Sequence, residues 1–286
     1  MKSCVVTLLA LTVLCGCMSV PDLDGHNATF LGANASVRYM NILSPVLSYN
    51  GFKDHVGQMK HMGANYVYVY TANQGDGSYV PFSLYHGHQI GGDLNGGVVD
   101  EVLKRLKYLQ KEGFGVVIWL RSDDTRWWDQ YGVAQQEKYQ SDVVKLYDDY
   151  AQAYVIGLEA DEYFSAGEVN HYAAHMQSIT KKPILTHQRP GRWDHATSAY
   201  VDGAGIQYGF GKSGGEVQHI TATAKAQLGG KPVYGVEYHK SSESNEARVL
   251  GDHVMAGGGS GTGNNRNNPP KRGNGWIGWF NDIKFW

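Results

Sequence analysis

Short apolar runs alternate with longer amphipathic stretches along most of the chain. Runs rich in Val, Ile and Tyr that end in polar residues are typical of buried strands. Such runs predict eight strands, at Val37–Ile42, Tyr66–Tyr70, Val116–Leu120, Tyr154–Leu158, Pro183–Thr186, Gly205–Tyr208, Pro232–Val236 and near Gly258–Gly263. Strands that alternate with helices favour βα units and a parallel sheet.

The stretches between the strands have helical periodicity. In two of them the apolar residues fall on one face of a helix: Val99, Val102, Leu103, Leu106 and Leu109, and Val217, Ile220, Ala224 and Leu228. Ser165-Ala-Gly-Glu168 and Ser213-Gly-Gly-Glu216 have the spacing of capping boxes, in which both side chains bind backbone N–H groups at a helix start. We therefore expect Glu168 and Glu216 to be structural.

This order of elements predicts one domain, a (β/α)8 or TIM barrel over residues 37–286. Such a barrel needs about 250 residues. An open doubly wound sheet is the alternative, but it usually has a glycine-rich phosphate loop after its first strand, where this chain has Asn41-Ile-Leu-Ser-Pro. The stretch Gly257–Gly275, rich in Gly and Asn, is then the loop after the eighth strand, before a closing helix at Trp276–Trp286.

Residues 1–16 have the features of a signal peptide, with an apolar core, Val5–Leu14, that is too short to span a membrane. The segment ends in Leu14-Cys-Gly-Cys17, which resembles the lipobox of bacterial lipoproteins, with Cys17 at the lipidated position. We expect residues 17–36 to be a tether and the protein to be lipid-anchored in a bacterial cell envelope. Because Met18 and not aspartate follows the cysteine, the outer membrane is the expected location. An ordinary cleaved signal peptide is the alternative.

Composition narrows the chemistry of the mature domain. All three cysteines, Cys4, Cys15 and Cys17, lie in the leader, which excludes disulfides and cysteine-type zinc sites beyond it. A net charge of −2 argues against nucleic acid as the partner. Aromatic residues make up 12% of the chain, with 19 Tyr and 7 Trp. This profile suits a protein that stacks on sugars, although a tyrosine-rich core would have the same composition.

Polar and aromatic residues gather where the predicted strands end, and barrel active sites lie at these carboxyl ends. They are Tyr39, Asn41, Tyr70, Arg121, Glu159, Asp161, Glu162, His187, Tyr208, Glu237 and His239. A carboxylate at the end of a buried strand is unfavourable unless it is paired with a cation, hydrogen-bonded, or kept for a role in catalysis or binding. Glu162 and Glu237 each close an apolar run, and together they would form the carboxylate pair that cleaves a glycosidic bond.

The placement of these two glutamates after the fourth and seventh strands resembles the large clan of retaining glycoside hydrolases built on the TIM barrel. Gly157-Leu-Glu-Ala-Asp161-Glu162 is similar to the clan's strand-four segment, and Val236-Glu237-Tyr238 is similar to its nucleophile segment. The resemblance implies a glycosidase that cleaves a poly- or oligosaccharide by a retaining mechanism without a cofactor. It implies Glu162 as acid/base and Glu237 as nucleophile.

The resemblance bears on two further positions. Asp161 stands where the clan usually has asparagine, and its carboxylate can accept but not donate a hydrogen bond to the sugar 2-hydroxyl. Tyr208 lies after the sixth strand, where members of the clan often have an aromatic residue or a histidine that steadies the nucleophile.

Glu159 is the alternative to Glu162 as acid/base. Regular alternation along the strand places the two side chains on opposite faces, and one bulge would reverse the choice. The run Glu159-Ala-Asp-Glu162 is either an acid site, in which neighbouring charges keep one carboxyl protonated, or a solvated loop. The alternative function is a catalytically inactive, glycan-binding lipoprotein on the same barrel.

Other residues are candidates for substrate binding. Arg121 would bind an anionic sugar substituent or neutralise the acidic pair, and His187, with Arg189 after it, would bind a sugar hydroxyl or the backbone. Trp128, from the doublet Trp127-Trp128, is a candidate stacking platform, although we expect one of the two tryptophans to belong to the core. Tyr70 and His239 are further candidates for substrate binding.

A metal site is not expected. Glu168, His171 and His175 have helical spacing similar to that of metal ligands, but they lie in the helix after the fourth strand, away from the strand ends. Only two histidines, His187 and His239, follow predicted strands, which is too few for a metal-dependent barrel hydrolase.

Overall fold

The computed structural model describes residues 39–41, 52–53, 56–57, 66–70, 96–121, 131–157, 159–207 and 214–237 of the 286-residue chain. The predicted signal peptide, Cys17, the tether, the eighth strand, the loop Gly257–Gly275 and the helix Trp276–Trp286 lie outside these ranges. Within the ranges, no helix is long and apolar enough to cross a membrane.

Seven strands form one parallel sheet, and each pairs with the strands next to it in the sequence. They are β1 (Tyr39–Asn41), β2 (Tyr66–Tyr70), β3 (Gly115–Trp119), β4 (Ala151–Val155), β5 (Ile184–Gln188), β6 (Gly203–Gln207) and β7 (Val233–Glu237). Each overlaps one of the predicted strands. β4 begins at Ala151, before the predicted start at Tyr154.

The order of the strands follows the order of the chain from β1 to β7 without a reversal. A doubly wound sheet reverses its strand order at the point where its ligand binds, whereas a barrel adds each strand beside the one before. The topology is therefore that of an α/β barrel, as predicted.

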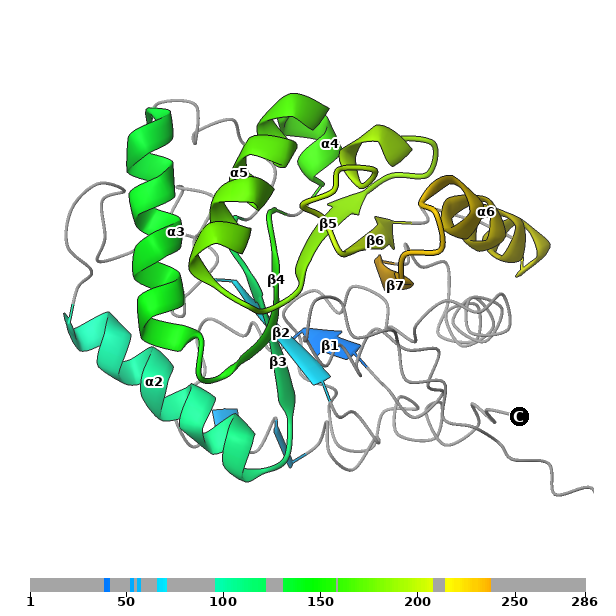
Figure 1. The fold of residues 1–286 in the computed structure, drawn as a ribbon. Coiled ribbons are helices and arrows are strands. Elements are labelled where there is room, and N and C mark those ends of the chain that lie inside the picture. Colours follow the sequence, from blue (N-terminus) through cyan, green and yellow to red (C-terminus); the bar gives the residue numbers. More distant parts are fainter. Residues whose placement is uncertain are drawn as a thin grey trace, which may run out of the picture.

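Helices connect the strands and lie outside them (Figure 1). They are α2 (Gly96–Lys111), α3 (Val133–Tyr147), the short α4 (Ala160–Tyr163), α5 (Ala166–Ile179) and α6 (Gly214–Gln227), with a 3₁₀ turn, η4 (Trp193–His195), between β5 and β6. In Figure 1, α2, α3 and α5 form an arc around the green and cyan strands.

The helical faces predicted from periodicity are the buried ones. In α2, Val99, Val102, Leu106 and Leu109 are buried, and Leu103 packs against the core. In α6, Ala224 is buried and Ile220 is partly buried, and Leu228 directly after the helix is also buried. The side chain of Val217 lies outside the described part of the structure.

The first capping box is present at the start of α5. Ser165 Oγ accepts the N–H of Glu168 at 3.2 Å, and Glu168 Oε2 accepts the N–H of Ser165 at 2.7 Å. Glu168 is therefore structural, as expected. Glu216 is exposed in the first turn of α6, and its predicted partner Ser213 is outside the described residues.

Candidate active site

The carboxyl ends of four neighbouring strands bring the candidate residues to one edge of the sheet. Glu159 follows β4, His187 is the penultimate residue of β5, and Gln207 and Glu237 are the last residues of β6 and β7. The backbone register places Gln207 directly beside Glu237. Cα positions on adjacent strands are about 4.8 Å apart, so Gln207 and Glu237 occupy neighbouring places on the edge.

Glu159 has an unusual backbone conformation. Its φ of 46° and ψ of 42° lie in the left-handed region, and within the described ranges it is the one non-glycine residue with a positive φ. A residue with a Cβ in this conformation costs roughly 1–3 kcal/mol, and such residues cluster at functional sites. Glu159 is also buried and immediately precedes α4.

His187 and Gln207 both bind Glu159. His187 Nδ1 accepts its backbone N–H at 2.9 Å, and Gln207 Nε2 donates a hydrogen bond to its carboxylate Oε1. Since a backbone N–H only donates, His187 Nδ1 carries no proton, and the imidazole is the neutral tautomer protonated at Nε2. The buried His187 ring also meets Trp119 edge to face, with 5.2 Å between the ring centroids.

Asp161 and Glu162, in α4, are bound by Arg189. Asp161 Oδ2 accepts from Arg189 Nε at 2.9 Å and its Oδ1 from the Arg189 backbone N–H at 3.2 Å. Arg189 Nη1 lies 3.1 Å from Glu162 Oε1. The Asp161 side chain is 0% exposed, against 30% for Glu162 and 47% for Arg189. The hydrogen bond to Asp161 raises the pKa of Arg189, which keeps the guanidinium charged between the two carboxylates.

The backbone pairing of β7 with β6 determines the position of Glu237. The register between β6 and β7 runs regularly to Ile206 and Gly235 and then shifts, so that Val236 has no partner in the ladder and Glu237 lies opposite Gln207. A shift of this kind is a β-bulge, which commonly occurs beside active sites. The side chain of Glu237 lies outside the described part of the structure.

Arg121 is built into the layer between the sheet and its helices. It is 1% exposed, its Nη1 donates to Ile156 O at 3.0 Å, and its Nε and Nη2 donate to Gln136 Oε1 at 3.3 and 3.1 Å. The guanidinium carbon lies 4.4 Å from the centre of the Tyr172 ring. Burial lowers the pKa of Arg121 to about 10. These contacts make Arg121 a link between β4, α3 and α5, so it is not part of the site that we propose.

For the other predicted site residues, the structure describes only the backbone or nothing. Tyr70 ends β2, where only its backbone is described. Tyr208, His239 and Trp128 lie outside the described residues.

The two α5 histidines face α3. His171 Nε2 is 3.0 Å from Glu137 Oε1, and His175 Nε2 is 3.1 Å from both the Glu137 carbonyl oxygen and Ser141 Oγ. Across the ranges that the structure covers, no group of three or more His, Cys, Asp or Glu side chains is arranged to hold a metal ion.

Sequence reasoning missed Gln207 and gave Arg189 no role of its own. Gln207 lies inside the predicted strand Gly205–Tyr208, one residue before the candidate Tyr208. A polar residue at the end of an otherwise apolar strand is the signal that identifies it. For Arg189, the signal is a cation directly after a strand that neighbours an acidic run.

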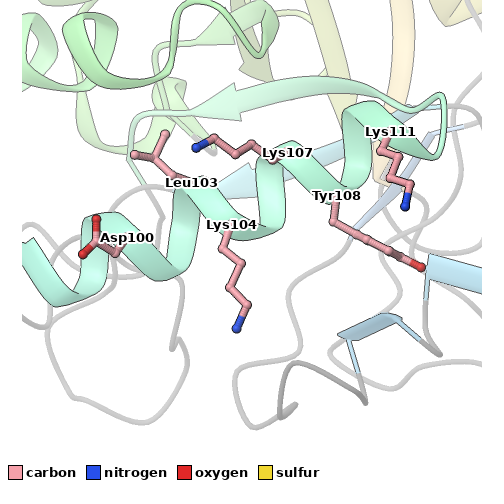
Figure 2. A pocket seen from close by; sticks show the side chains of 6 residues that line it. All are labelled: Asp100, Leu103, Lys104, Lys107, Tyr108 and Lys111. Atoms are coloured by element: carbon pink, nitrogen blue, oxygen red, sulfur yellow. The ribbon is translucent and has the colours of Figure 1, made fainter.

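A pocket of about 450 Å³ lies against α2, remote in sequence from the strand-end residues. Figure 2 shows six side chains of α2 that line it, which are those known from the described part of the chain: Asp100, Leu103, Lys104, Lys107, Tyr108 and Lys111. None of them is a candidate for the chemistry described above.

No protein-family model and no curated protein matches the chain. Its structure is similar to that of a glycoside hydrolase family 5 protein from Bacteroides vulgatus, with a TM-score of 0.61 and 15% identity over 80% of this chain and 57% of that one. It is similar to a glycoside hydrolase family 5 mannosidase from Rhizomucor miehei, with a TM-score of 0.60 and 11% identity over 81% of this chain and 86% of that one.

An N-acetylneuraminate lyase from Fusobacterium nucleatum is also similar, with a TM-score of 0.51 and 10% identity over 89% of this chain and 75% of that one. The chain thus spans little more than half of the Bacteroides structure but most of the other two. These likenesses confirm the predicted (β/α)8-barrel fold. Because glycosidases and a lyase share it, the activity has to be argued from the site.

Proposed function

We propose that this protein is a retaining glycoside hydrolase that cleaves a poly- or oligosaccharide with two glutamates. The observation that carries the proposal is the position of Gln207, which is bonded to the Glu159 carboxylate and is the register neighbour of Glu237. A carboxylate pair about 5–5.5 Å apart is the requirement for retention, and Gln207 links the Glu159 carboxylate to the strand end that carries Glu237. Barrel glycosidases among the structural neighbours support the reaction class.

Glu237 is the proposed nucleophile, and Glu159 is preferred to Glu162 as acid/base. Glu162 is exposed, and its carboxylate is already engaged in an ion pair with Arg189. Glu159 is buried at the strand ends, and its carboxylate is bonded to Gln207, the register neighbour of Glu237. Its strained backbone is a second sign of a functional position.

In the proposed first step, the Glu237 carboxylate forms a bond to the anomeric carbon as the glycosidic C–O bond breaks. The proton of Glu159 passes to the departing oxygen. In the second step Glu159, now ionised, takes a proton from water, and the water oxygen displaces Glu237 from the anomeric carbon. The same carboxyl group therefore acts as acid and then as base.

The test compares Glu159→Gln, Glu162→Gln and Glu237→Gln on a polysaccharide panel and on aryl glycosides whose phenols differ in acidity. Glu237→Gln should abolish all turnover. Glu159→Gln should lower turnover about 10²–10⁴-fold on substrates with poor leaving groups and much less on 2,4-dinitrophenyl glycosides, which need no protonation. Glu162→Gln should have a small effect on both.

A wild-type protein that binds glycans but turns over none of these substrates would refute the enzyme and leave the glycan-binding alternative. If Glu162→Gln, and not Glu159→Gln, gives the leaving-group dependence, the acid/base is Glu162.

We also propose that Cys17 carries a lipid that anchors the protein in the outer membrane of a bacterium. The lipobox-like segment Leu14-Cys-Gly-Cys17 supports this. An alkyne fatty acid fed to expressing cells should label the wild type and not Cys17→Ser, and the label should fractionate with outer membranes. Equal labelling of both proteins would contradict the proposal.

A further inference from the structure

We propose that His187 is a positioning residue, which fixes Glu159 in its left-handed conformation by accepting the Glu159 N–H at Nδ1. Gln207 completes the arrangement by orienting the carboxylate. The inference rests on the proposed role of Glu159 as acid/base, and it adds how the fold holds that carboxyl group.

The conformation of Glu159 needs support from its surroundings. Residues in the left-handed region persist only where neighbouring structure over-determines them. Chain continuity supplies part of this, because Glu162 N–H donates to Glu159 O at 2.8 Å at the start of α4. The N–H of Glu159 points the other way, to His187 Nδ1. A buried N–H without an acceptor costs about 1–3 kcal/mol, so the imidazole removes a penalty that the strained conformation would otherwise carry.

His187 is itself rigidly placed. It lies in β5, paired with Gly205 of β6, is fully buried, and its ring meets the Trp119 ring of β3 edge to face. Its Nδ1 therefore cannot follow Glu159 if that residue moves. Gln207 is bound in the same way by its place at the end of β6. Strands β5 and β6 thus fix two points of one residue: its amide and its carboxylate.

Residue 159 is a glutamate and not a glycine, which indicates that its carboxylate has a functional role. Glycine adopts the left-handed conformation without the Cβ penalty, and a turn needed only for chain reversal would favour it. This chain has a glutamate there, with a carboxylate that faces a side-chain donor from another strand. A strained backbone, a histidine acceptor and an amide donor all act on the one carboxyl group.

His187→Asn and His187→Leu form the matched test. Asparagine Oδ1 can take the place of Nδ1 as acceptor, whereas leucine has a similar bulk and no acceptor. With 2,4-dinitrophenyl and unactivated aryl glycosides as probes, His187→Leu should reproduce the pattern of Glu159→Gln. We expect kcat to fall about 10²-fold or more on the unactivated substrate, to fall much less on the activated one, and KM to change little. His187→Asn should restore most of the lost kcat.

Amide hydrogen exchange of the peptide that contains Glu159 provides a readout that needs no activity. Protection should be lost in His187→Leu and kept in His187→Asn. Unchanged protection in His187→Leu would overturn the inference, as would an equal loss of kcat on activated and unactivated glycosides. If protection responds as expected but Glu159→Gln shows no leaving-group dependence, the contact is confirmed and the proposed function of Glu159 fails.

Discussion

The side-chain amide of Gln207 donates a hydrogen bond to the carboxylate of Glu159, although 48 residues separate them in the sequence. The bond joins the end of β6 to the turn after β4 across the end of β5. Because Gln207 also lies beside Glu237 in the ladder, it connects the two glutamates that we propose for catalysis. If the two glutamates act as we propose, Gln207 positions them without itself taking part in proton transfer or bond formation.

Replacing Gln207 by leucine should impair the acid step. The Glu159 carboxyl loses the donor that orients it, so we expect kcat to fall at least tenfold on unactivated aryl glycosides and less on 2,4-dinitrophenyl glycosides. Gln188→Leu is the matched control, since Gln188 is also a buried strand-end glutamine but is bonded to Thr186. Equal losses of kcat in both variants would show that Gln207 has no special role.

The left-handed conformation of Glu159 predicts an order of stabilities. Glu159→Gly and Glu159→Ala both remove the carboxylate and its bond to Gln207, but only alanine keeps a Cβ in the strained position. The glycine variant should be more stable than the alanine variant by about 1 kcal/mol, measured as the free energy of unfolding in urea. The reverse order, with alanine the more stable, would mean that residue 159 is not left-handed in solution.

Removal of Arg189 should destabilise α4 through Asp161. Arg189→Met leaves the buried Asp161 carboxylate with the backbone N–H of residue 189 but without the guanidinium. We expect a loss of about 1–3 kcal/mol in the free energy of unfolding.

Asp161→Asn should recover part of this loss in the Arg189→Met background, because a neutral amide needs no counter-charge. A double-mutant cycle measures the coupling. Simple additivity of the two substitutions would argue against the ion pair in solution.

Arg121 should matter for stability and not for binding. Arg121→Lys loses the paired hydrogen bonds to Gln136 and the stacking on Tyr172, so unfolding should become easier by about 2–4 kcal/mol. At a temperature where the variant is folded, KM on every substrate should stay within about twofold of the wild-type value. A large rise in KM for anionic glycans alone would restore the substrate-binding role considered from the sequence.

The strands were predictable because burial on both faces leaves a plain apolar signal. The first and last residues of the strands were harder to predict. β4 starts at Ala151, in a segment of Ala and Gln that has low strand propensity. Pairing with β3, across a register shift at Val116 and Val117, extends the strand further than its composition indicates. Tertiary contacts decided the boundary, and these are not visible in local sequence.

Among the candidates at the strand ends, the structure brings Glu159 and His187 into contact, but the sequence did not predict how the side chains there point. Alternation was the basis for separating Glu159 from Glu162, yet β4 ends at Val155 and Glu159 is already in a left-handed turn. Alternation does not apply beyond the end of a strand. Likewise Arg121 follows β3 as expected, but its side chain turns outward into the helical layer. Directions after a strand end depend on single backbone torsions, which a sequence pattern does not specify.

The unpaired residue Val236 has a consequence for the position of Glu237. By leaving the ladder, it brings Glu237 level with Gln207 and not one strand step, about 3.3 Å, further on. An apolar residue with no chemistry of its own thus sets where the Glu237 backbone lies on the strand-end edge, and a graft of this edge onto another barrel would have to carry Val236 with it.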